Sequence, residues 1–157
     1  MTDMLIKLYA LPPLEPKLEA QAAQGISIRR VLPPEKHFVT TWVGNQFSAF
    51  WQSECEIAFG HTPPTCWVAT ENKQTIGFGC YDTTSKGFFG PTGVSEAARG
   101  RGVGQALLLV CLHAMRWEGY GYAIIGGVGP AEFYAKTVGA TVIEDSTPGI
   151  YNGLLRQ

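Results

Sequence analysis

The 157 residues suit one domain of ordinary size that can bury a substantial core. Apolar residues make up 45% of the chain and charged residues 16%, which is typical of a soluble globular protein and excludes a disordered one. The formal net charge of −1 gives no reason to expect nucleic acid or an anionic membrane as a partner.

The cysteines and the N-terminus bear on the compartment in which the protein works. No two cysteines form a C-x-x-C pair, so their spacing predicts neither a zinc site nor a disulfide framework. The first residues do not resemble a signal peptide, and the longest wholly apolar run, residues 106–112, is too short to span a bilayer. We therefore expect a cytoplasmic protein with reduced thiols, no metal ion and no membrane partner. The four cysteines are Cys55, Cys66, Cys80 and Cys111.

The N-terminal part of the chain predicts a strand, a short helix and a second strand. Residues 4–11 favour a strand that stops at a double proline. Residues 14–24 are rich in Ala, Glu, Gln and Lys, which favours a helix ending at Gly25. Residues 26–32 read as the next strand, and a second double proline ends it.

Helical and hairpin patterns follow. Residues 35–59 have helical length with apolar side chains on more than one face, which predicts one or two helices covering a sheet, with Gly44 as a candidate break. Residues 65–71 and 74–82 flank a short Asn-Lys turn and predict a hairpin. Residues 88–94 predict another strand, in which a proline should interrupt the ladder and favour a bulge or a splay.

A glycine-rich loop connects that strand to an apolar helix predicted over residues 103–117. Glycine at alternate positions lets the backbone approach a ligand closely, and the helix N-terminus that follows offers N–H groups to an anion. Arg99 and Arg101 add positive charge that suits a phosphate group. The loop therefore predicts a phosphate site.

Two common phosphate loops do not fit this stretch. A P-loop requires Gly-Lys-Ser or Gly-Lys-Thr, and neither occurs in the chain. The dinucleotide fingerprint requires G-x-G-x-x-G, whereas the spacing here is Gly100-x-Gly102-x-Gly104, and only Glu118 stands near the distance of a ribose-binding acid. A nucleotide triphosphatase and a dinucleotide-binding protein are both disfavoured.

The rest of the chain predicts a strand over residues 123–128, a short helix over 132–138, and two closing strands over 140–144 and 150–155. Strands and helices in this order predict an α/β protein with a mixed sheet.

Two motifs resemble the GNAT acyltransferase superfamily. Arg99-x-x-Gly102-x-Gly104 is similar to its pyrophosphate-binding motif R/Q-x-x-G-x-G/A, and the wider V-x-P-x-x-R-G-x-G-x-G pattern also fits except that Glu96 stands where proline is usual. Downstream, Phe133-Tyr134 followed by Gly139 resembles the family segment N-x-x-A-x-x-F-Y-x-x-x-G-F, although the asparagine and the last aromatic residue are missing. The resemblance covers roughly residues 26–155.

The resemblance implies the fold and its division. We expect an α/β, GNAT-like, mixed and mostly antiparallel twisted sheet of about seven strands flanked by helices, splayed between the fourth and fifth core strands, 88–94 and 123–128. Residues 1–25, a strand plus a short helix, would be an N-terminal extension of a single N-acetyltransferase domain over residues 26–157. The extension would be an ordinary appendage, an extra edge strand or a contact in a homodimer.

The resemblance also implies the chemistry, which is transfer of an acetyl group from acetyl-CoA to a small-molecule or protein amine. Tyr134 would be the general acid that protonates the departing thiolate. Candidates for holding the amine or accepting its proton are Glu54, Glu56 and Asp82. Besides Tyr134, the cofactor would contact Gly93, Val94, Ser95, Arg99, Gly100, Arg101, Gly102, Val103, Gly104 and Gln105.

Two other functions are compatible with the same residues. A non-catalytic acyl-CoA-binding regulatory module would keep the loop without an acceptor site, as the missing asparagine and the lack of an obvious base allow. An interaction protein with an empty cleft would have no affinity for CoA.

Overall fold

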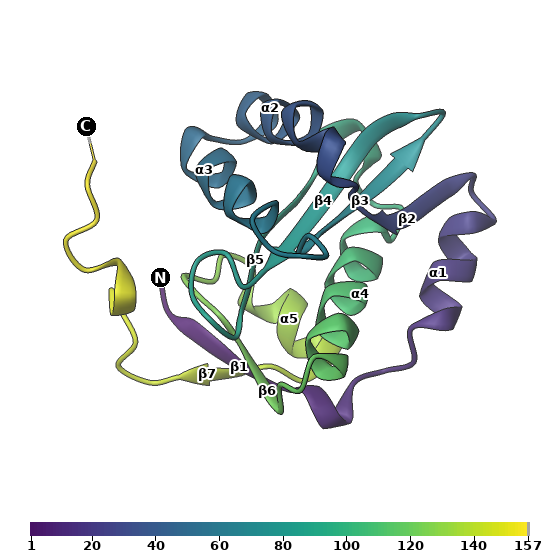
Figure 1. Cartoon of the computed structure of the whole chain (residues 1–157). Coiled ribbons are helices and arrows are strands. Elements are labelled where there is room, and N and C mark those ends of the chain that lie inside the picture. Colours follow the sequence, from purple (N-terminus) through teal and green to yellow (C-terminus); the bar gives the residue numbers. More distant parts are fainter. Residues whose placement is uncertain (157) are drawn as a thin grey trace.

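Seven strands form one sheet in the computed structural model, which describes residues 1–156 (Figure 1). The strand order is β2-β3-β4-β5-β6-β1-β7, and every neighbouring pair is antiparallel except β5 and β6, which are parallel. The predicted mixed and mostly antiparallel sheet is thus confirmed. The strands are β1 (Asp3–Lys7), β2 (Ile26–Arg30), β3 (Cys66–Glu71), β4 (Gln74–Tyr81), β5 (Phe88–Val94), β6 (Tyr122–Ile125) and β7 (Thr141–Ile143).

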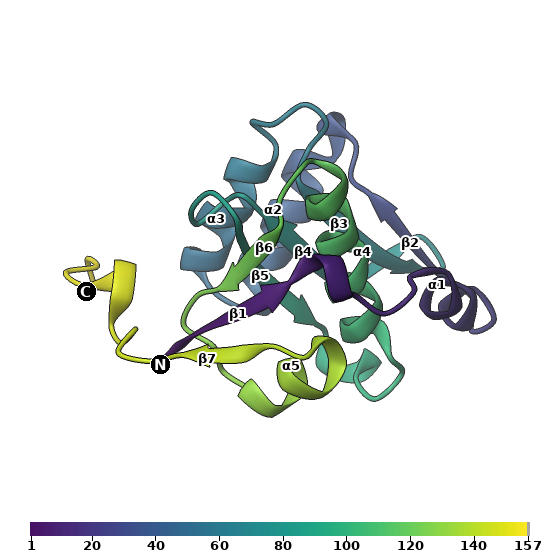
Figure 2. The same ribbon diagram turned by 90° about the horizontal axis from the view of Figure 1, so that it is seen from below.

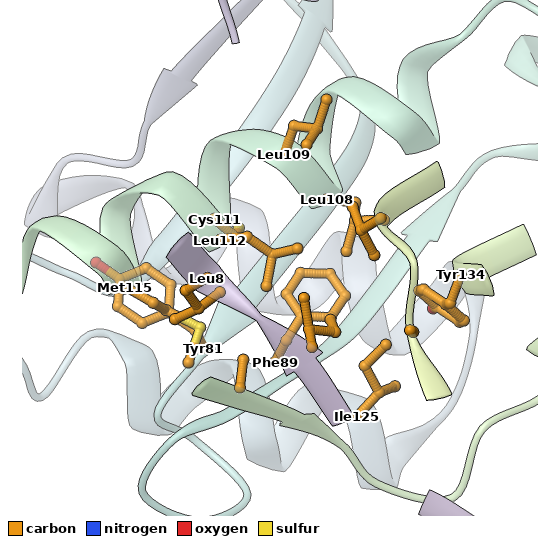
Figure 3. Packing of buried hydrophobic residues seen from close by; sticks show 14 of the residues in the cluster. Leu8, Tyr81, Phe89, Leu108, Leu109, Cys111, Leu112, Met115, Ile125 and Tyr134 are labelled. Carbon is orange, nitrogen blue, oxygen red and sulfur yellow. The ribbon is translucent and has the colours of Figure 1, made fainter. Parts of the chain in front are cut away.

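Helices cover both faces of the sheet (Figure 1). One face carries α4, and the opposite face carries α2 and α3, so the buried side chains divide into separate clusters on the two sides. Alternation along β4 explains the division, because Phe78 and Cys80 face α2 and α3 whereas Tyr81 joins the α4 side. Figure 3 shows Phe89 packed near Leu112 of α4 and Tyr81 near Leu8 and Met115. The helices are α1 (Glu15–Ala22), α2 (Lys36–Gln46), α3 (Ala49–Ala58), α4 (Val103–Trp117) and α5 (Ala131–Val138).

The break between α2 and α3 lies at Phe47–Ser48 and not at Gly44 as predicted. Ser48 begins α3 as its N-cap, and its hydroxyl accepts a hydrogen bond from the Trp51 N–H at 3.1 Å. Gly44 lies inside α2, where a Cβ would collide with the side chain of Gln52. The glycine therefore serves the close packing of the two helices rather than a turn.

The N-terminal strand lies inside the sheet rather than at its edge (Figure 2). β1 pairs with β6 through Met4 and Ile125 and with β7 through Met4 and Val142. Met4 and Ile6 are buried in the main core. The strand and the short helix of residues 1–25 form as expected, but the expectation that this strand could be an extra edge strand was wrong, because β1 pairs on both sides, with β6 and with β7.

The prediction of a second closing strand over residues 150–155 was also wrong. A 3-10 turn occupies Gly149–Tyr151, and an irregular segment follows it. Gly153 has a φ of +78°, which is incompatible with an extended strand at that point. The sheet still has about seven strands as expected, because β1 belongs to it although the strand over residues 150–155 does not form.

The sheet splays between β5 and β6, as predicted. Their parallel pairing is limited to Phe88 with Ile124 and Phe89 with Ile125. Within residues 1–156, β5 continues to Val94 without a strand partner on this side. Pro91 has no N–H to donate, so it cannot continue a ladder at this point. No helix among residues 1–156 is both long enough and apolar enough to cross a membrane.

Candidate active site

The splay opens into a cavity of about 840 Å³. Its walls come from β5, the glycine loop, the start of α4, the segment after β6, and α5, with Trp51 and Glu54 of α3 at one end. The cavity therefore joins the predicted phosphate loop to the predicted general acid. A cavity of this volume lies within the range of small-molecule and cofactor sites.

Backbone groups dominate the end of the cavity formed by the glycine loop. Gly100 and Gly102 have φ of +80° and +83°, a left-handed conformation that favours glycine. Gly102 is the N-cap of α4, whose first backbone bond runs from the Ala106 N–H to the Gly102 carbonyl at 3.1 Å. The preceding N–H groups of the first turn have no intrahelical acceptor, which makes this helix end suitable for an anion.

The loop is braced by α1, which sequence reasoning did not foresee. The Gln21 side-chain amide donates to the Arg101 carbonyl at 2.9 Å, and the Gln24 amide donates to the same oxygen at 3.0 Å. The Lys17 ammonium donates to the Gln105 side chain at 3.1 Å. Gln21 is buried, so this contact fixes the loop from behind. The helical pattern of residues 14–24 predicted α1 but gave no signal for what it contacts.

The two loop arginines differ in their positions. Arg99 lines the cavity and is exposed. Arg101 turns away and makes two hydrogen bonds to the Glu71 carboxylate, at 2.7 and 3.1 Å. These bonds from the guanidinium hold the pKa of the Glu71 carboxyl below its usual range. Only the first arginine therefore offers its charge to a ligand in this cavity.

Most of the predicted cofactor-binding residues come together. Among the described residues, those of the set that line the cavity are Gly93, Val94, Arg99, Gly100, Gly102, Val103, Gly104, Gln105 and Tyr134. Ser95 lies outside it and donates its N–H to the Ile76 carbonyl at 2.9 Å. The prediction of a direct contact from Ser95 or from the Arg101 side chain is therefore not supported by this geometry.

Tyr134 projects from α5 into the splay and lies near Leu108 and Ile125 (Figure 3). Its side chain is 7% exposed, and its ring meets that of Phe133 edge to face at 5.1 Å between centroids. Burial raises the pKa of the Tyr134 hydroxyl to about 12. The phenol is consequently neutral near pH 7 and carries a proton that it can donate.

Of the three candidate carboxylates, Glu54 alone lines the described cavity. It accepts a hydrogen bond from the Thr84 hydroxyl, and burial raises the pKa of its carboxyl. Glu56 is exposed elsewhere on α3. Asp82 is engaged structurally, since its carboxylate accepts from the Gly87 N–H at 2.8 Å and from the Tyr120 hydroxyl at 2.9 Å. The geometry favours Glu54 over the other two.

A second cavity of about 650 Å³ continues from the first on the α3 side. The two share Trp51, Glu54, Thr84 and Tyr151, so Glu54 stands where they meet. Tyr151 comes from the C-terminal turn and Thr84 from the loop after β4. Sequence reasoning missed both residues, because no local motif marks a loop threonine or a tyrosine as part of a site.

Comparisons with solved structures agree with the fold. A GCN5-related glucosamine N-acetyltransferase region of a fungal multi-domain GH3 beta-N-acetylglucosaminidase matches with a TM-score of 0.73 and 15% identity, covering 90% of this chain and 19% of that one. A GCN5-related N-acetyltransferase from Sphaerobacter thermophilus matches with a TM-score of 0.67 and 24% identity, covering 90% and 48%. The chain thus spans less than half the length of either structure.

The sequence was also compared with known proteins and families. A search of curated proteins gives no significant match. The model of the Acetyltransferase (GNAT) family matches residues 35–139, which include α2, the hairpin, the glycine loop, α4 and α5. This match extends over more than half of the chain and contains both sequence motifs. The chain belongs to the GNAT family of acetyltransferases.

Proposed function

We propose that this protein transfers an acetyl group from acetyl-CoA to an amine. One observation carries the proposal: a single cavity in the β5–β6 splay contacts the glycine loop, Tyr134 and Glu54. Family membership supports acyl transfer in general. The residues that line the cavity support the more specific proposal that acetyl-CoA is the donor and an amine the acceptor.

The phosphate end of the cavity suits the pyrophosphate of CoA. The left-handed glycines bring the backbone close, and the first turn of α4 offers N–H donors together with the positive end of the helix dipole. Arg99 adds an exposed positive charge. The pantetheine arm would lie between β5 and β6, where β5 beyond Phe89 is free of β6.

Tyr134 and Glu54 suit the two proton transfers of the reaction. The amine nitrogen attacks the thioester carbon, a C–N bond forms, and the C–S bond breaks when the tetrahedral intermediate collapses. Glu54, or a water held by it, takes one proton from the ammonium acceptor, so that the neutral amine attacks. The Tyr134 hydroxyl gives its proton to the departing thiolate and regains one, directly or through water, from the nitrogen of the intermediate, so the net reaction releases the one proton taken by Glu54. The backbone N–H groups of β5 next to the splay could stabilise the developing oxyanion.

The second cavity suits the acceptor. Glu54 provides a carboxylate at its junction with the first cavity, and Trp51, Phe50 and Tyr151 supply aromatic walls. A cationic amine would therefore find its charge partner beside the thioester. Both a small molecule and a side chain of a protein remain candidates for the acceptor.

Calorimetric titration of the full chain with acetyl-CoA tests the cofactor site. Gly102→Val forces a β-branched residue into a left-handed conformation and brings its Cβ to 3.0 Å from the Gln21 amide nitrogen. The strain alone, about 1–2 kcal/mol, predicts a loss of affinity of about tenfold or more. Gly119→Val is the matched control, since it has φ of +105° but open space around its Cβ at the far end of α4.

The outcomes separate the alternatives. Similar affinities for the wild type and the control, with binding by Gly102→Val weakened about tenfold or more, support the site and justify a screen of amines. Tight binding with no transfer to any amine would identify a non-catalytic acyl-CoA-binding module instead. No binding by the wild type would overturn the proposal.

A further inference from the structure

Three thiols meet beneath α3, away from the cavity. Cys55 comes from α3, Cys66 from β3 and Cys80 from β4, and their three Sγ atoms all lie within 4.8 Å of one another. Each of the three residues is fully buried. Cys66 and Cys80 are direct partners in the β3–β4 ladder, so the strand register brings them together and α3 adds the third thiol from above.

The fourth cysteine lies on the other side of the sheet. The three thiols belong to the cluster that also contains Val39, Val43 and Phe78 under α2 and α3. Cys111 is equally buried but belongs to α4 and to the opposite core, as Figure 3 shows. The chain therefore contains three convergent thiols and one isolated thiol in similar apolar surroundings.

The spacing of the three thiols suits a metal ion. A metal–sulfur bond of about 2.3 Å places the sulfurs of a trigonal thiolate site about 4.0 Å apart. Small side-chain rotations that move each sulfur by a few tenths of an ångström would bring the three sulfurs to this separation. Among the described residues, the potential ligands grouped here are the thiols alone. A donor set of sulfur without oxygen selects thiophilic ions such as Zn²⁺ or Cu⁺ over Mg²⁺ or Ca²⁺.

Burial in an apolar cluster opposes charge on all three sulfurs, and a bound cation removes most of that penalty.

We propose that Cys55, Cys66 and Cys80 form a trigonal thiolate site for one thiophilic metal ion. On binding, the three S–H groups release their protons to solvent and three metal–sulfur bonds form, with no change of oxidation state. The ion would fasten α3 to the β3–β4 hairpin. Because Glu54 precedes Cys55 on α3, the same clamp would fix the helix that carries the candidate base. The site does not depend on the acetyl-transfer proposal.

Metal loading during refolding tests the site, since a buried site could be slow to fill in the folded protein. The full chain without a polyhistidine tag is refolded from denaturant with a phosphine reductant and Cd²⁺ or Zn²⁺ alone, and loose ions are removed by desalting. We expect one retained ion per chain, and with Cd²⁺ an ultraviolet thiolate-to-metal charge-transfer band. Cys80→Ala should lose both signals, whereas Cys111→Ala should keep them.

Other outcomes would contradict the proposal. Refolded wild-type protein that retains no ion would overturn it, as would equal losses in Cys80→Ala and Cys111→Ala. Should Cys80→Ala fail to refold, X-ray absorption of the loaded wild type decides. A coordination shell of three sulfurs supports the site, and a shell of oxygen or nitrogen atoms overturns it.

Discussion

The two ends of the cavity are built in different ways. The phosphate end consists largely of backbone from one continuous stretch, the glycine loop and the start of α4, with α1 behind it. The acceptor end consists of side chains from distant segments, such as Glu54 of α3, Thr84 of a loop and Tyr151 of the C-terminal turn. A site formed by backbone groups requires one particular chain conformation. A site formed by side chains from loops and helices can change the ligand that it binds through a few substitutions. We therefore expect the phosphate end to set the cofactor and the acceptor end to set the substrate.

The largest effect should come from Tyr134, which lies between the two ends. Tyr134→Phe removes the proton donor but keeps the ring, so we expect kcat to fall by about 10²–10⁴-fold with acetyl-CoA affinity nearly unchanged. Steady-state kinetics and calorimetry measure the two quantities. Tyr120→Phe removes a hydroxyl that bonds Asp82 outside the cavity, and it should keep its turnover. Wild-type turnover in Tyr134→Phe would exclude the acid role.

Glu54→Gln should damage the acceptor end selectively. Loss of a charged hydrogen-bonding partner, worth about 1.5–3 kcal/mol, predicts a decrease of about 10–100-fold in kcat/KM for the amine without loss of acetyl-CoA binding. Glu56→Gln, an exposed substitution on the same helix, is the control. An equal effect of both variants would remove Glu54 from the site.

The pH profile sharpens the same comparison. A base works as the carboxylate, and burial raises the pKa of Glu54, so activity should decline on acidification at a higher pH than for an exposed glutamate. The Tyr134 hydroxyl, with a pKa of about 12, should cause no decline on the alkaline side below pH 10. Profiles of kcat/KM for wild type and Glu54→Gln test this, and an unchanged acidic limb in the variant would contradict it.

Gln21→Ala should weaken the phosphate end by a smaller amount. It removes one bond to the Arg101 carbonyl while Gln24 still donates to that oxygen, so we expect a loss of about 1 kcal/mol, or several-fold in acetyl-CoA affinity. Glu19→Ala, on the exposed side of α1, should leave the affinity unchanged. Amine specificity should not change in either variant, and a change would contradict the division between the two ends.

The smallest effect should come from the Glu71–Arg101 pair at the surface. The pair keeps the pKa of Glu71 low, so its contribution to stability is present above the ordinary pKa of glutamate and is lost as pH falls through the lowered value. Glu71→Gln should therefore lower the unfolding temperature slightly at pH 7 and not in strong acid. If Glu71→Gln lowered the unfolding temperature more in acid than at pH 7, the Glu71–Arg101 pair would not be the cause of the stabilisation.

Local sequence signals predicted the backbone geometry of the glycine loop for a physical reason. Positive φ at Gly100 and Gly102 and the following helix are properties of one short stretch, and they can be read from its spacing. The hairpin, α4 and the interruption of the ladder at Pro91 are equally local. The pairing of Arg101 with Glu71 could not be predicted from the sequence, because Glu71 is brought near only by the fold.

Non-local contacts account for the remaining errors. The convergence of Cys55, Cys66 and Cys80 depends on the register of β3 and β4, which sequence spacing does not reveal. The position of β1 could not be inferred from its own residues either, because a buried strand and an edge strand of five residues have similar composition. The sequence does not distinguish Glu54 from Glu56 and Asp82 as the acceptor-site carboxylate. The position of α3 in the fold is what places Glu54 at the cavity.

The pairing of β1 with β6 and β7 has a consequence for biosynthesis. β1 is a central strand whose partners, such as Ile125 and Val142, lie far downstream in the sequence and are translated long after it. Its apolar residues Met4 and Ile6 must then stay unpaired until β6 and β7 have been synthesised. A nascent chain that stops before β6 would leave this apolar strand without partners, and such an unpaired strand is a surface that favours aggregation.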